Sequence, residues 1–105
     1  MTQVVVNPGI CGMKTMVEVF EINKRKVRLK IDSDCEIIAK IKESLAEIDL
    51  LDAIKSPVDS VVYKQFSKFH SHASCPVPMA IIKAIEVEVG MALPKSVFVE
   101  FKVVE

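Results

Sequence analysis

Two segments of the 105-residue chain alternate between apolar and polar residues, and the region between them repeats apolar residues at helical spacing. In the first segment, Val27, Leu29 and Ile31 are separated by charged residues. In the second, Val97 to Val103 shows the same period of two. This alternation is typical of strands with one buried face, whereas spacings of three and four residues are typical of helices. The order strands, helices, strand predicts an α+β fold with a mostly antiparallel sheet and helices packed on one face.

The individual elements follow from apolar spacing and from turn residues. Strands are expected at Thr2–Val6, Met13–Ile22, Val27–Asp32 and Val97–Val103. Helices are expected at Asp34–Ile48, at Asp49–Ile54, from Ser60 to Phe69, and from Pro76 or Pro78 to Val89. The short turn at Asn23 should make the second and third strands an antiparallel hairpin. Ser33 and Glu36 have the spacing of a capping box for the first helix.

Length and composition set the class of protein. We expect a single domain spanning residues 1–105, with an aliphatic core, because half of the residues are apolar. The formal net charge is zero, which disfavours a partner as strongly charged as nucleic acid. No apolar run reaches the roughly 18 residues of a membrane span, and the start does not read as a signal peptide. These features predict a cytoplasmic protein with reduced thiols.

The three cysteines occupy similar places along the chain. Cys11 follows a strand, in a turn rich in glycine and proline; Cys35 lies at a helix start; and Cys75 precedes the last helix. Free backbone amides at such positions stabilise a thiolate, which is the form that binds metals. If the three segments converge, they make a three-cysteine site for zinc or an iron–sulfur cluster. His70, His72 or a ligand from outside the chain could take the fourth position.

Two other classes of function remain open on the same residues. Each cysteine could be a small buried hydrophobe, as free cysteines commonly are. The protein would then be an interaction module without chemistry, and we expect it to be a homodimer, because the strand Thr2–Val6 and the C-terminal strand are apolar and can lie at a sheet edge. The third class is a thiol enzyme with Cys75 or Cys35 as the nucleophile.

Three short motifs suggest a relationship to a known family. They are Asn7-Pro8-Gly9-Ile10-Cys11-Gly12, Ser33-Asp34-Cys35 and Cys75-Pro76-Val77-Pro78. Together they resemble a family of small, uncharacterised prokaryotic proteins, met mainly in anaerobic bacteria and archaea, over nearly the whole chain. The resemblance implies no catalytic role. It implies that the three thiols belong together, and an anaerobic setting would suit an oxygen-sensitive cluster.

Overall fold

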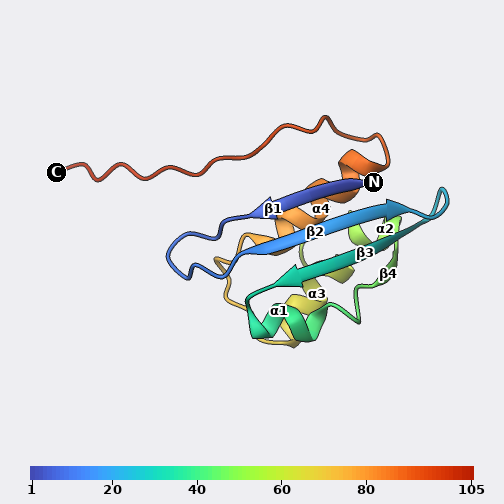
Figure 1. The fold of residues 1–105 in the computed structure, drawn as a ribbon, viewed down its shortest axis with the longest axis horizontal. Coiled ribbons are helices and arrows are strands. Elements are labelled where there is room, and N and C mark those ends of the chain that lie inside the picture. Colours follow the sequence, from blue (N-terminus) through green and yellow to red (C-terminus); the bar gives the residue numbers. More distant parts are fainter.

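The computed structural model describes residues 1–105, which form four strands and four helices (Figure 1). The strands are β1 (Thr2–Val6), β2 (Thr15–Glu21), β3 (Lys26–Ser33) and β4 (Glu47–Asp49). The helices are α1 (Glu36–Ile41), α2 (Leu50–Ala53), α3 (Val61–Lys68) and α4 (Val77–Glu88). None of the helices combines the length and the apolar character that crossing a membrane would require.

The four strands form one antiparallel sheet in the order β1-β2-β3-β4 (Figure 1). The predicted hairpin is confirmed as β2 and β3, and the Asn23 side chain closes its turn by accepting the amides of Arg25 and Lys26 at 2.8 and 3.0 Å. Inward-facing residues of β3 are buried and its outward-facing residues are exposed, as a period of two requires. The α+β class is therefore confirmed.

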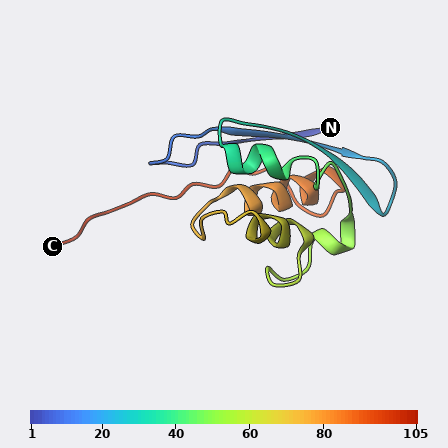
Figure 2. The same cartoon turned by 90° about the horizontal axis from the view of Figure 1, so that it is seen from below.

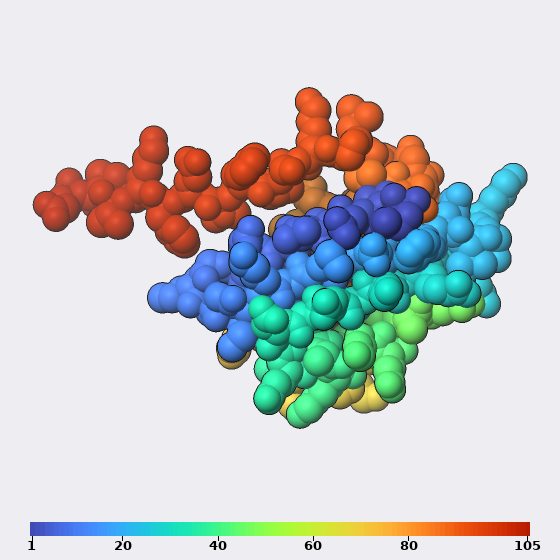
Figure 3. Space-filling model, viewed as in Figure 1, coloured from blue at the N-terminus to red at the C-terminus, as the bar shows by residue number.

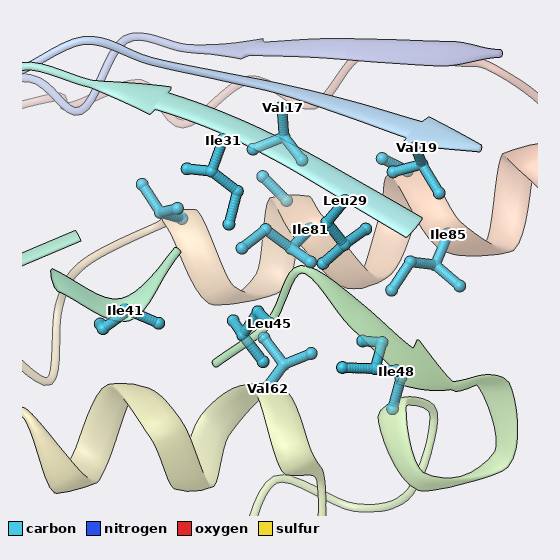
Figure 4. Packing of buried hydrophobic residues seen from close by; sticks show 14 of the residues in the cluster. Val17, Val19, Leu29, Ile31, Ile41, Leu45, Ile48, Val62, Ile81 and Ile85 are labelled. Carbon is cyan, nitrogen blue, oxygen red and sulfur yellow. The ribbon is translucent and has the colours of Figure 1, made fainter. Parts of the chain in front are cut away.

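The helices cover one face of this sheet, and the opposite face is open (Figure 2). The core between the two layers is aliphatic except for Phe66, and Figure 4 shows it from close by. Its labelled members from the strands are Val17, Val19, Leu29, Ile31 and Ile48, and those from the helices and the turn after α1 are Ile41, Leu45, Val62, Ile81 and Ile85. Helix α4 lies directly beneath β1 and β2, so the last helix supports the first strands.

The end of α4 has two features that fix where the chain goes next. Gly90 adopts a φ of +80°, and the Met91 amide bonds to the Glu86 carbonyl at 2.8 Å, which together form a Schellman motif. Just before it, the Glu88 carboxylate accepts the Thr2 hydroxyl at 2.7 Å. The helix therefore ends beside the start of β1, and the chain reverses its direction there.

One predicted helix is much shorter than expected. The apolar spacing predicts a helix over residues 34–48, but α1 ends at Ile41, where the Ser44 amide and hydroxyl both donate to its carbonyl, at 3.0 and 2.7 Å. The Ala46 carbonyl then accepts the Leu29 amide at 2.8 Å, and β4 begins. Leu45 remains fully buried. The same apolar residues thus reach the core through a turn and an edge strand, because β3 offers hydrogen bonds that a longer helix would leave unmade.

The predicted C-terminal strand does not belong to the sheet. Residues 96–105 are extended and exposed, and they make no backbone hydrogen bond to the rest of the chain. The exposed fraction is 51% at Val97, 80% at Val99 and 93% at Phe101. Figure 3 shows this segment projecting from the body of the molecule. The prediction that Val97–Val103 completes the sheet is therefore wrong, although its alternating pattern is that of a half-buried strand.

Candidate functional site

The segments that carry the three cysteines lie toward the same end of the sheet (Figure 1). There the hydroxyls of Thr15 and Ser33 share a hydrogen bond of 2.6 Å, which ties the start of β2 to the end of β3. The loop before β2 carries Cys11, and the residues after β3 lead into Cys35. The chain enters α4 at the same end, just after Cys75 (Figure 1). Lying toward the same end does not bring the three thiols together, because the cysteines are scattered there.

Cys11 lies at the tip of a tight turn and is exposed. Gly9 and Gly12 have φ values of +89° and +68°, in the left-handed region that favours glycine, and the Gly12 amide donates to the Gly9 carbonyl at 3.0 Å. Ile10 beside it is fully exposed. The turn therefore presents the Cys11 side chain to solvent, away from the core.

Cys35 is the residue that precedes α1, and its side chain is half-buried against the core. The predicted capping box does not form, because the Ser33 hydroxyl is used elsewhere: it accepts the Cys35 amide at 3.1 Å and bonds to Thr15. No side chain caps α1. Cys35 is thus positioned by its backbone and by apolar packing, as a small core residue would be.

Cys75 is half-buried and packs against the core just before α4. Burial raises the pKa of its thiol, a hydrogen bond from the Val77 amide opposes that shift, and the negative charges of ionised Cys35 and Cys11 add to the rise. The sequence predicts the opposite direction, a thiolate stabilised at the start of a helix. A raised pKa favours the protonated thiol, which is the less nucleophilic form.

The predicted metal centre is not formed. No group of three or more histidine, cysteine, aspartate or glutamate side chains comes together in a way that could hold a metal ion. The prediction that Cys11, Cys35 and Cys75 hold zinc or an iron–sulfur cluster is therefore wrong. The reason is that Cys11 points outward from its turn, whereas the other two side chains pack against the core. His70 and His72, the predicted additional ligands, are exposed in the connection between α3 and α4.

A different feature is the free edge of β1. The alternation of hydrogen bonds along β2 shows which N–H and C=O groups of β1 lie on this edge. The Glu21 amide of β2 donates to the Glu88 carboxylate at 3.1 Å, and the same carboxylate accepts the Thr2 hydroxyl of β1. The N–H group of Glu21 therefore faces the β1 side of β2. Because hydrogen-bonding direction alternates along a strand, residues 15, 17 and 19 of β2 bond with β1. Their register partners are Thr2, Val4 and Val6. The N–H and C=O groups of Gln3 and Val5 therefore face the open edge.

The two edges of the sheet differ in how they are protected. The β4 edge has only three residues, and its acidic residues Glu47 and Asp49 form ion pairs with Arg28 and Arg25 at 3.9 and 3.5 Å. The β1 edge has five residues with the sequence Thr-Gln-Val-Val-Val, without a charged residue or a proline. Short length and charge are the usual protection of an edge against a further strand. Only the β1 edge lacks both.

The C-terminal tail, residues 96–105, complements this edge in character. It is extended along its length, and its large apolar residues are exposed (Figure 3). They are Val97, Phe98, Val99, Phe101, Val103 and Val104, with exposed fractions from 51% to 94%. A run of apolar residues left uncovered in this way usually marks an interaction site. One molecule thus holds an unpaired strand edge and an unpaired strand-like segment.

These features define a small α+β protein whose antiparallel sheet has helices on one face and one unprotected edge. The chain belongs to the family of unknown function DUF6951, whose model matches residues 2–101. The match includes β1 and most of the tail, and it confirms the predicted relationship to an uncharacterised family. No curated protein and no solved structure matches the chain.

Proposed function

We propose that this protein is an interaction module that binds a protein partner by β-strand addition. In this mode β1 is the edge that accepts a strand, and Val97–Val103 is a segment that can be donated as one. Main-chain hydrogen bonds to a sheet edge supply affinity, and alternate side chains supply specificity. The observation that carries the proposal is that the tail is extended, apolar and uncovered while the β1 edge is unpaired and unprotected.

Both faces of an added strand would find suitable neighbours. On the helix side of the sheet, Val4 of β1 is only half-buried, so a strand beside it would extend the core. The tail offers Val97, Val99, Phe101 and Val103 on one face and Phe98, Glu100 and Lys102 on the other. Apolar residues on one face with mixed residues on the other suit a sheet that is covered by helices on one side only.

We also propose that the module acts in the cytoplasm. The three cysteines are free, and a reducing compartment keeps free thiols from pairing. Cys35 and Cys75 then serve as core residues next to the buried cluster.

A binding experiment with the tail as a separate peptide tests strand addition. The acceptor is the chain ended after Lys95, which loses no internal hydrogen bond and no buried side chain. A labelled peptide of residues 96–105 should bind it saturably. Val5→Pro should weaken binding at least about tenfold, because proline removes an outward donor worth about 1.4 kcal/mol but no bond of the β1–β2 ladder.

The matched control is Val5→Thr, which keeps the shape of the side chain and the N–H group. It should bind the peptide as the unsubstituted acceptor does. Hydrogen exchange should show slower exchange at Gln3 and Val5 when the peptide is bound, since these are the amides that face the edge. Equal binding by the proline and threonine variants, or unchanged exchange at these two amides, would refute strand addition at β1.

A further inference from the structure

We infer that the partner is a second copy of this chain, and that two copies exchange their C-terminal strands. Val97–Val103 of each copy pairs with β1 of the other, so that each sheet gains a fifth strand. The inference rests on the proposed function, because it names the partner that uses the β1 edge. The structure supports it through the path of the tail, the match of the two surfaces and the symmetry of the exchange.

The path of the tail carries the strand segment past the edge of its own sheet. The tail leaves α4 beside the start of β1, where the Glu88 carboxylate contacts both the N-terminal ammonium at 3.5 Å and the Thr2 hydroxyl at 2.7 Å. From Gly90 the chain runs back in the direction of β1 (Figure 1). The connecting residues are not fully extended, because the Met91 and Ala92 amides donate to the Glu86 carbonyl at 2.8 and 3.2 Å and the Lys95 amide donates to the Leu93 carbonyl at 2.8 Å.

The segment that follows these turns makes no backbone hydrogen bond to its own β1, and its end lies beyond the body of the molecule. Figures 1 and 3 show the red end of the chain continuing beyond the body of the molecule, and the longest dimension is 50 Å against 29 and 24 Å for the others. A segment placed there lies outside its own domain but within reach of a neighbouring molecule.

The two surfaces also match in charge and polarity. Thr2–Val6 is uncharged, and the chain as a whole has no net charge, so two copies do not repel each other. On the outer face of the sheet, next to Gln3 and Val5, the tail would place its mixed side, which contains Glu100 and Lys102. Glu100 and Lys102 would stay solvated on this outer face, while the valines of the other side of the tail and Phe101 would face the helices. Pairing thus buries apolar residues without burying a charge.

Reciprocal exchange satisfies both tails and both edges in one closed dimer. If only one tail were donated, the first copy would keep an open edge and the second would keep an exposed tail, and further copies could add without end. Two-fold exchange of identical elements avoids this outcome, and it is a common route to dimers. The geometry therefore points to a two-fold dimer, which also covers the apolar surface that each chain leaves exposed.

A complementation experiment with full-length chains tests the exchange. One variant, Val5→Pro, carries a blocked edge and an intact tail. The other, with Val99→Glu and Phe101→Glu, carries an intact edge and a tail whose apolar face is charged. Light scattering should give the wild-type chain twice its monomer mass of 11.7 kDa, and each variant alone the monomer mass. An equimolar mixture should form a heterodimer, since it contains one good tail and one good edge.

Two matched controls keep the chemistry of the surfaces. Val5→Thr retains the edge amide, and Glu100→Gln removes a charge from the outer face of the tail; both should remain dimers. Circular dichroism of each chain excludes loss of fold. If Val5→Pro unfolds, Gln3→Pro replaces it, because Gln3 is the other residue whose backbone faces the open edge.

Each other outcome overturns the exchange in a distinct way. A tail variant that still dimerises alone means that edges pair with edges, and an edge variant that still dimerises alone means that tails pair with tails. A wild-type monomer with slow exchange at Gln3 and Val5 means that the tail binds its own edge, so strand addition stands and the second copy does not. A wild-type monomer with fast exchange at both amides, together with failed peptide binding, refutes strand addition itself.

Discussion

The Glu88 carboxylate should be the most sensitive polar group in the fold, because it joins the last helix to the first strand. It accepts the Thr2 hydroxyl at 2.7 Å and the Glu21 amide at 3.1 Å, it lies 3.5 Å from the N-terminal ammonium, and its side chain is only 13% exposed. Glu88→Gln keeps one oxygen acceptor but replaces the other with an N–H₂ group. The side-chain amide can turn so that its oxygen accepts the Glu21 N–H and its N–H₂ group donates to the Thr2 hydroxyl, so both bonds persist as neutral ones and the attraction to the N-terminal ammonium is lost.

The expected cost follows from these contacts. A hydrogen bond to a charged group contributes about 1.5–3 kcal/mol, whereas one between neutral groups contributes about 0.5–1.5 kcal/mol, so each of the two bonds loses about 1 kcal/mol when the charge is removed. We therefore expect Glu88→Gln to lower the free energy of unfolding by about 2 kcal/mol at pH 7, measured by urea denaturation. Glu86→Gln, two residues earlier on the same helix, is the control; its side chain makes no hydrogen bond or ion pair, and the change should be within about 0.5 kcal/mol.

The pH dependence provides a second readout with a defined sign. Although partial burial raises the pKa of Glu88, the bonds from Thr2 and Glu21 and the nearby ammonium outweigh it and lower the pKa below its usual value. A carboxyl group with a lowered pKa in the folded state stabilises the fold above its unfolded-state pKa of about 4.3, and that contribution is lost as pH falls through the folded-state pKa. Wild type and Glu88→Gln should thus converge in stability at acid pH. A constant difference between them from pH 7 to pH 2, or none beyond the Glu86 control, would refute this reasoning.

Three further predictions concern the core, the end of α4 and the thiols. Ile81→Ala at a fully buried position should lower the free energy of unfolding by about 2–5 kcal/mol, whereas Ile10→Ala at a fully exposed position should change it little; thermal or urea unfolding distinguishes them. Gly90→Ala should lower the free energy of unfolding by about 1 kcal/mol, because alanine is strained at a φ of +80°. An added Cβ would meet no atom within 4 Å, so a larger loss in the same assay would show a steric clash instead. Thiol titration at pH 7.5 should modify exposed Cys11 first and Cys75 last, because Cys75 is half-buried and burial raises its pKa; fast labelling of Cys75 would contradict this order.

The elements that periodicity predicts correctly are those whose sequence and surroundings agree. In β3, strict alternation coincides with helices on one side and solvent on the other, so local pattern and tertiary position give the same result. In the region after α1 they disagree. Leu45 and Ile48 fit a helical stripe equally well, but β3 has free backbone groups there, and an edge strand satisfies them. Spacing alone cannot reveal a hydrogen-bonding partner that lies elsewhere in the chain.

The candidate metal site fails for a related reason. The positions of Cys11, Cys35 and Cys75 relative to strand and helix ends are visible in the sequence, and the topology places those ends toward the same end of the sheet. The direction of each side chain is not visible. It depends on the turn at Gly9 and Gly12, which turns one thiol outward, and on core packing, which turns the other two inward. Ligation requires converging side chains, and sharing an end of the sheet is a weaker condition.

In the tail, the apolar alternation predicts the extended conformation correctly but does not identify the strand that pairs with it. Alternation at Val97–Val103 indicates a strand with one apolar face, and the segment is extended in the structure. A strand nevertheless needs a neighbour for its backbone groups, and alternation does not say whether that neighbour belongs to the same molecule. The path after the reversal at Gly90 bears on the question, because the apolar segment makes no backbone hydrogen bond to its own β1 and its end lies beyond the body of the molecule. The edge that remains free on β1 is then available to the corresponding segment of another chain, and pairing would give β1 a second ladder in addition to its bonds with β2.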